Sequence, residues 1–172
     1  NYSGRFFKAP DVFDLERLKK AESEWATRCE AELADSWPRE ELFTSYMTHR
    51  LNGGIPNWGY THWWKMFSPR QLLVHAQILR AIVLAPDSKW PLDVSEQALG
   101  AFQQHLRYCS MFSFYQQQYD KTIPHFSNAN YHPKMLVSEI YAFAPLGAGR
   151  WISCAGLVVE GVSWESEPWE LA

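Results

Sequence analysis

Cysteines and long apolar runs are both scarce in this sequence of 172 residues, which contains only three cysteines. Cys29, Cys109 and Cys154 form no C-x-x-C pair, which argues against a disulfide framework and against a structural zinc site. No apolar run is long enough to cross a bilayer, because the longest, Ile78–Ala85, is interrupted by Arg80. The start also lacks the charged-then-apolar pattern of a signal sequence. We therefore expect a cytoplasmic protein without a membrane partner, whose cysteines are small buried hydrophobes.

Aromatic residues, by contrast, are abundant: they make up 16% of the chain and include nine Trp. Hydrophobic residues at 47% and charged residues at 20% describe a folded protein, because disordered chains lack that much apolar surface. Aromatic side chains bury large areas in cores, and they also stack on flat ligands such as nucleobases. Composition therefore leaves two uses open for the tryptophans, which are packing of a core and stacking on a ligand.

The net charge of −3 is spread unevenly over one expected domain. Residues 1–45, interpreted as an acidic N-terminal helix region, hold 7 Lys and Arg against 10 Asp and Glu. Residues 46–159, an aromatic-rich core, hold 9 against 5, and residues 160–172 form an acidic tail with none against 4. The mild positive excess of the core is compatible with a nucleic-acid surface, although a dedicated DNA-binding domain is usually more basic. Because the chain begins with Asn1, we expect an internal segment of a larger protein.

The spacing of apolar residues predicts several helices. Over Asp11–Ala34, apolar residues recur every three or four positions, and the first residue is a suitable N-cap. Another helix is predicted to begin with Ser68 as its N-cap and Pro69 in its first turn. A second long helix is predicted over Val94–Tyr119, with a break near Ser110 left open.

Shorter elements complete a predicted fold that is mainly α, with two long helices, several short helices and room for a minor β element. The apolar stretch Met135–Phe143 fits either a strand or a buried helix, because its period does not decide. The other expected elements are a short helix over Glu40–Arg50, turns at Asn52–Asn57 and Gly147–Gly149, and a helix over Trp151–Val162.

Several blocks of residues follow one another in an order known from one protein family. The blocks are Phe6–Pro10 before an acidic helix, Trp58-Gly59-Tyr60, Phe67–Leu73, the predicted helix Ala98–Tyr115, Phe126-Ser127-Asn128, and Val137-Ser138-Glu139 ahead of Pro145-Leu146-Gly147. In these blocks the chain resembles the large adenine-specific DNA methylases of prokaryotic phage-defence islands, a domain-of-unknown-function family. The resemblance covers nearly the whole chain, and its most specific part is Phe67-Ser68-Pro69-Arg70-Gln71-Leu72.

The resemblance implies an insert in a larger α/β methyltransferase. In that family an Asp-Pro-Phe motif with a Gly-rich turn binds the cofactor and an Asp-Pro-Pro-Tyr motif is catalytic, and neither occurs here. It therefore implies a target-recognition or scaffold segment of an S-adenosylmethionine-dependent enzyme, with no cofactor bound by this piece alone. Its implied partners are double-stranded DNA, the remaining catalytic part of the same enzyme and other defence proteins.

An aromatic-rich stretch supplies the first candidate DNA-binding residues. Methylation of adenine N6 in a duplex requires flipping the base, which costs a few kcal/mol, and aromatic stacking offsets part of that cost. A stacking platform is predicted from Trp58, Tyr60, Trp63 and Trp64. The alternative is that these rings only pack against the helix that begins at Pro69.

Polar residues supply the second set of candidates. Arg70 and Gln71 lie in a predicted first helical turn, where free backbone N–H groups favour a phosphate, but Arg70 could instead tie the aromatic stretch to an acidic partner. A polar loop adds the candidates Lys121, His125, Asn128, Asn130 and His132. A contact between this loop and the catalytic part of the enzyme is the alternative. The spacing of its two histidines is weak evidence for a metal.

Buried or paired polar residues are predicted elsewhere. Glu139 lies in an apolar stretch, so we expect an ion pair with Arg150 or Arg107. His75 and His105 lie within predicted helices and are interpreted as core or surface residues rather than ligands. No catalytic residue is assigned, because neither a Ser-His-Asp order nor a Gly-flanked nucleophile occurs. Two other functions stay open: a helical protein–protein adaptor of a defence complex without DNA contact, and a binder of a flat small ligand.

Overall fold

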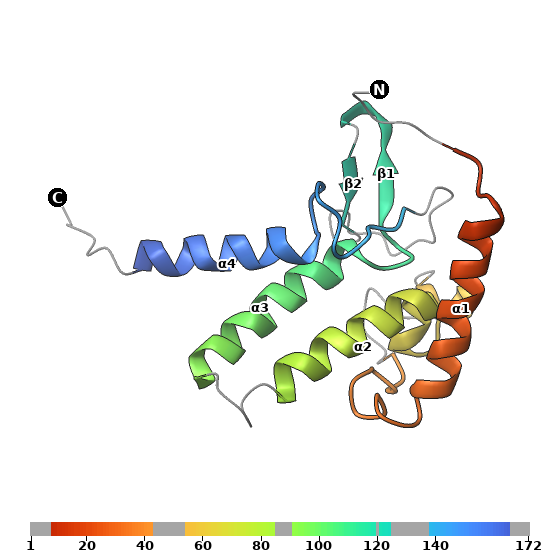
Figure 1. Cartoon of the computed structure of the whole chain (residues 1–172), viewed down its shortest axis with the longest axis horizontal. Helices are drawn as coiled ribbons and strands as arrows, with labels where there is room; N and C mark the ends of the chain where they lie inside the picture. Colours follow the sequence, from red (N-terminus) through yellow and green to blue (C-terminus); the bar gives the residue numbers. More distant parts are fainter. Residues whose placement is uncertain (1–7, 43–53, 85–90, 120, 125–137, 166–172) are drawn as a thin grey trace.

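A computed structural model describes residues 8–42, 54–84, 91–119, 121–124 and 138–165, and within them the fold is mainly α, as predicted. The helices are α1 (Val12–Arg28), α2 (Pro69–Leu84), α3 (Leu92–Tyr108) and α4 (Trp151–Glu165), and a hairpin is formed by β1 (Phe114–Gln116) and β2 (Lys121–Ile123). Short 3-10 helices are η2 (Ile55–Trp58), η3 (Trp63–Met66) and η5 (Gln117–Tyr119). In Figure 1, α1 packs beside α2, α2 beside α3, and α4 crosses one end of α3 and extends outward.

Helix α1 begins as the sequence predicts but ends earlier. Asp11 and Asp14 form a reciprocal capping box, in which each carboxylate accepts a hydrogen bond from the other residue's backbone N–H. The helix ends at Arg28, so the prediction of one helix to Ala34 was wrong at its C-terminal end. The chain turns there and carries Leu33 into a buried cluster with Leu73 and Ala76 of α2. The apolar spacing that suggested a longer helix includes Leu33, but Leu33 is buried by a turn of the chain instead, because tertiary packing overrides helix propensity at a helix end.

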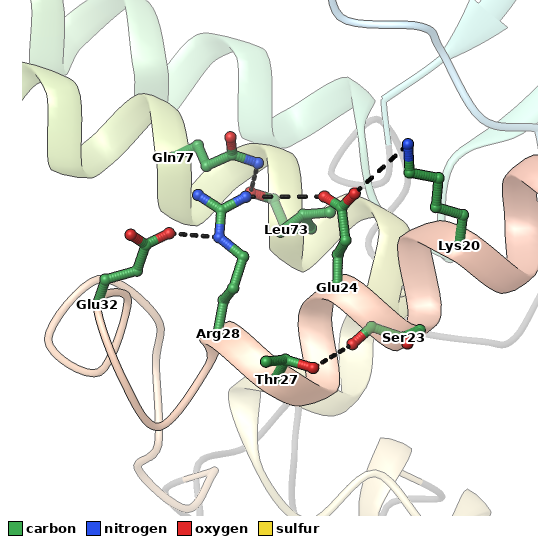
Figure 2. A network of polar contacts seen from close by, with 8 residues as sticks. All are labelled: Lys20, Ser23, Glu24, Thr27, Arg28, Glu32, Leu73 and Gln77. Atoms are coloured by element: carbon green, nitrogen blue, oxygen red, sulfur yellow. Dashed lines mark hydrogen bonds and ion pairs between the residues drawn. The ribbon is translucent and has the colours of Figure 1, made fainter.

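Charged side chains along the C-terminal half of α1 form a ladder (Figure 2). Lys20 pairs with Glu24 at 3.9 Å, and Arg28 pairs both with Glu24 at 3.8 Å and with Glu32. Figure 2 places this ladder opposite Leu73 and Gln77 of α2. Each pair is four residues apart and partly exposed, so each contributes only about 0.3–0.5 kcal/mol to stability. The ladder therefore lies along the side of α1 that faces α2, where solvent still reaches it in part.

Helices α2 and α3 form the centre of the fold. Ile78 and Ile82 of α2 are buried against Phe102 of α3, and Trp151 of α4 packs against the same cluster. A second cluster joins Ile55, Met66 and Phe112, with Tyr60, Trp63 and Phe67 packed on it. The aromatic stretch that precedes α2 thus contributes to the core.

The hairpin occupies a region where a helix was predicted. Helix α3 ends at Tyr108 rather than Tyr119, just before the break that the sequence left open. Beyond it Phe114 pairs with Ile123 and Gln116 with Lys121 in antiparallel register. Aromatic and β-branched residues favour strands. The apolar residues whose spacing suggested a continuing helix lie here in a turn and in β1.

The segment between the hairpin and α4 is irregular. Residues 138–143 form neither a strand nor a helix, which differs from both readings of Met135–Phe143, while residues 135–137 lie outside the described part. The predicted turn near Gly147 is confirmed, because Gly147 and Gly149 have φ of 118° and 80°. At Gly149 a Cβ atom would lie 2.2 Å from that of Tyr108, so only glycine fits beneath that ring.

Two further predictions fall partly outside the described residues. Of the expected short helix over Glu40–Arg50, only residues 40–42 are described, and there Glu41 forms an isolated β-bridge with His62. Of the expected turn at Asn52–Asn57, the described residues enter η2, whose C-cap is Gly59 with φ of 88°. Within the described part, no helix has the length and apolar character that a membrane crossing requires.

Candidate functional site at the Arg70–Glu139 ion pair

The start of α2 is organised by a reciprocal cap. The Ser68 hydroxyl accepts a hydrogen bond from the backbone N–H of Gln71 at 3.2 Å, and the Gln71 side-chain oxygen accepts one from the N–H of Ser68 at 2.8 Å. This arrangement is a capping box and confirms that the helix begins at Pro69 behind a Ser N-cap. Gln71 is 4% exposed, so its amide is occupied by the cap and is not presented at the surface.

A carboxylate from a distant part of the chain meets this helix start. Glu139 forms an ion pair with Arg70, 69 residues earlier, and its other oxygen accepts a hydrogen bond from the Ser68 hydroxyl at 3.3 Å. The Arg70 side chain is 49% exposed and that of Glu139 is 22% exposed, so solvent screens the pair in part. The prediction of an ion pair for Glu139 is confirmed, but the predicted partners were wrong.

The predicted partners of Glu139 have other contacts. Arg150 donates to the Ser153 hydroxyl at 2.7 Å and to the carbonyl oxygens of Ala144 and Pro145, which fastens the turn before α4. Arg107 donates to the Gln104 side chain at 2.9 Å. Both arginines are nearer to Glu139 in sequence than Arg70 is. The packing of residues 139–142 against α2 therefore decides the partner of Glu139, and closeness in sequence does not.

Behind the ion pair lies a pocket of about 240 Å³. Its wall is formed by α2, the end of α3 and residues 139–142, and it includes Arg70, His75, His105, Cys109, Glu139 and Tyr141. His75 and His105 are buried, with ring centroids 5.2 Å apart. The pocket thus lies between an exposed ion pair and two interior imidazoles.

Each imidazole donates one hydrogen bond to a backbone carbonyl. His75 Nε2 donates to the carbonyl of Cys109 at 2.8 Å, and His105 Nδ1 donates to that of Gly149 at 2.6 Å, because a carbonyl oxygen only accepts. Within the described part, Nδ1 of His75 and Nε2 of His105 have no partner, and both atoms are shielded from solvent. A ligand in the pocket would not reach them in this conformation, so the histidines are core residues, one of the two roles predicted.

Burial also fixes the protonation states of these groups. Desolvation lowers the pKa of His75 to about 4 and lowers that of His105, so both imidazoles are neutral at pH 7. Desolvation, followed by the charge of Glu139, raises the pKa of the Cys109 thiol to about 12. A protonated thiol is a poor nucleophile. The pocket therefore holds no activated nucleophile, and in the described part no three His, Cys, Asp or Glu side chains converge as a metal site.

The four aromatic candidates divide into exposed and packed residues. Trp58 is 60% exposed at the end of η2. Tyr60 contacts the ring of Phe112 at 5.0 Å, and Trp63 packs against the same cluster. Trp64 contacts Trp37 edge-on at 6.4 Å and lies under the Lys65 ammonium at 5.7 Å. The last three are therefore packed, but these contacts are with Phe112, its cluster and Trp37 rather than with the helix that begins at Pro69, which was the alternative that the sequence left open, and Trp58 keeps exposed surface.

Of the remaining candidates, the structure describes only Lys121, which does not line this pocket. Lys121 is exposed at the start of β2, with its ammonium 5.2 Å from the ring of Tyr119. The candidates His125, Asn128, Asn130 and His132 lie outside the described residues. The structure instead adds Glu139 and Cys109 to the surroundings of Arg70. The apolar surroundings of Glu139 in the sequence were the signal that it needed a partner.

Comparison of the chain with protein-family models, with curated proteins and with solved structures finds no match.

Proposed function

We propose that this chain is the scaffold or target-recognition segment of an S-adenosylmethionine-dependent, adenine-specific DNA methyltransferase of phage defence. One observation carries the proposal. Two blocks on which the family resemblance rests, Phe67–Leu73 and Val137–Glu139, are far apart in sequence, and Arg70 and Ser68 of the first contact Glu139 of the second. Residues that act in one site, or that hold one part of a fold together, are expected to lie close to each other, and these three residues do.

The contacts favour a scaffold role for several of the candidate residues. Gln71, Tyr60 and Trp63 are used in capping and packing, and Arg70 is held by Glu139. Arg70 and Trp58 keep exposed surface with which they can meet a strand. In this proposal, the segment orients DNA while methyl transfer takes place on residues of the catalytic part, which also binds the cofactor.

The experiment is a methyl-transfer assay with the complete enzyme, duplex DNA and S-adenosylmethionine, read by mass spectrometry of the nucleosides. We expect N6-methyl-2′-deoxyadenosine from the parent enzyme and a clear loss of product with Arg70→Ala. The matched control is Arg80→Ala, since Arg80 is exposed further along α2 and lines no pocket around Arg70. No methylated adenine from the parent enzyme, or equal losses in both variants, would contradict the proposal.

A second candidate function is a helical protein–protein adaptor, and the exposed face of α4 favours it. Ile152, Leu157 and Val159 are 60%, 58% and 68% exposed, on a helix that packs on α3 and buries Cys154. Exposed apolar surface of this kind can mark a protein contact. An adaptor would bind its partner through this helix and show no salt-sensitive affinity for DNA, which separates it from the first proposal.

A further inference from the structure

We infer that a groove between the N-terminal ends of α1 and α2 binds backbone phosphates of nucleic acid, an inference that rests on the proposed function and assigns it new contact residues. The groove has a volume of about 430 Å³. Its cationic residues are Lys8, which precedes α1, Arg17 in the second turn of α1, and Arg70 in the first turn of α2. They are at least nine residues apart in sequence, and the packing of α1 against α2 brings them together.

Arg17 is the residue most available for a ligand. It is exposed, and within the described part it forms no ion pair, whereas Lys8 is paired with Asp11 and Asp14 at 3.0 and 2.6 Å. The other cations of α1 that have partners, Lys20 and Arg28, belong to the ladder of Figure 2. A guanidinium without a carboxylate partner can bind a phosphate through two parallel N–H groups.

Arg70 is a second contact even though it is paired. A guanidinium carries five N–H donors, and Glu139 uses only part of them, while 49% of the side chain is exposed. The ion pair fixes the direction of the side chain before a ligand arrives, which lowers the entropic cost of binding. Arg70 lines both the groove and the pocket, so its side chain lies between them.

The groove also contains one opposing charge, Asp14. Its carboxylate is bound by the Lys8 ammonium and accepts a hydrogen bond from the backbone N–H of Asp11, and these hydrogen bonds lower the pKa of Asp14. Lys8 therefore offsets one of the two carboxylates of the capping box, and the guanidinium groups of Arg17 and Arg70 add further positive charge to the lining of the groove. A pair of guanidinium groups suits a strand of phosphates, since phosphate contacts position a duplex without reading its sequence.

The test is a fluorescence-anisotropy titration of the full chain into a short labelled DNA duplex at a series of salt concentrations. With Arg17→Ala we expect roughly three- to tenfold weaker binding at low salt, and a slope of log K against log salt that is smaller by about 1. Arg70→Lys keeps the charge and loses the fork of donors, so a smaller loss of affinity is expected. Lys19→Ala is the matched control, because Lys19 lies roughly 200° around α1 from Arg17, outside the groove.

Three outcomes would overturn the inference. One is the absence of DNA binding by the parent chain at low salt, and another is an equal effect of Arg17→Ala and Lys19→Ala. The third is displacement of the duplex by inorganic phosphate or by a mononucleotide at equal phosphate concentration, because the groove would then recognise an isolated phosphate rather than a backbone. Methyl transfer by the complete enzyme is measured separately, so failure of the groove is distinguishable from failure of the proposed function.

Discussion

In two regions of this molecule the usual distribution is reversed, because polar side chains are buried in one and apolar side chains are exposed in the other. The interface between α2 and α3 buries two imidazoles, with 6% of His75 and none of His105 exposed, whereas the outer face of α4 exposes Ile152, Leu157 and Val159. The buried polar groups find acceptors within the chain, at the carbonyls of Cys109 and Gly149. The exposed apolar groups have no such internal partner in the described part. The chain itself thus satisfies one nitrogen of each buried imidazole, while the exposed apolar residues of α4 point to a contact with something else.

The largest expected effect tests whether stability resides in the packed interior rather than in α4. Phe112 is 2% exposed and contacts Tyr60, so Phe112→Ala should lower the free energy of unfolding by about 3–5 kcal/mol. Leu157→Ala removes a mostly exposed side chain of α4 and should cost below about 0.5 kcal/mol. Urea denaturation followed by tryptophan fluorescence measures both changes. Similar losses would mean that the Leu157 side chain is buried in solution, and the contrast between the interior and the exposed residues of α4 would not hold.

The next effect concerns the protonation of the buried imidazoles. The pKa of His75 is about 4 in the folded protein, against an ordinary 6.5. As the pH falls through 6.5 the unfolded chain takes up a proton that the folded chain does not, so full stability is present above 6.5 and is lost towards pH 4. Each pH unit of that window is worth about 1.4 kcal/mol, which gives a loss of roughly 3 kcal/mol.

The measurement is the urea midpoint between pH 7.5 and pH 4, for the parent chain and for His75→Gln. The Gln amide can still donate to the Cys109 carbonyl but does not titrate, so the variant should show a shallower dependence on pH. An unchanged dependence would assign the effect to other groups, including His105, whose pKa is also lowered by desolvation.

The smallest effect is expected at the surface, in the ion pair between Arg70 and Glu139. Because Arg70 is 49% exposed, solvent screens the pair, and we expect a coupling energy of only about 0.5–1 kcal/mol. A double-mutant cycle with Arg70→Ala, Glu139→Gln and both together isolates this energy from other consequences of each change. A coupling above about 2 kcal/mol would show that the pair behaves as a buried one and belongs with the interior.

The fold could be predicted from the sequence where local chemistry decides. Ser68 and Pro69 mark the start of α2, and the small apolar residues from Trp151 onward indicate α4. The end of α1 could not be predicted, because it depends on the burial of Leu33 against α2. The hairpin after α3 was missed for a similar reason. Its strands pair with each other, and apolar spacing along one segment does not reveal pairing with another.

The candidate site was predictable in part. The apolar surroundings of Glu139 indicated that it needed a cation, but the sequence could not show that Arg70 was the cation that packing brings to it. Arg17 had the appearance of an ordinary solvated residue of an amphipathic helix, and only the contact between α1 and α2 places it in a groove with Arg70. Contacts between distant segments carry this information, and no local pattern contains it.

Gly149 lies between the buried imidazoles and α4. Its carbonyl accepts the hydrogen bond of buried His105, and two residues later α4 begins. Its φ of 80° and the Tyr108 ring against its Cα leave no room for a side chain. We therefore expect Gly149 to be among the positions of the chain that least tolerate substitution. A new residue there would displace the acceptor of an interior imidazole and the direction of the outer helix in a single step.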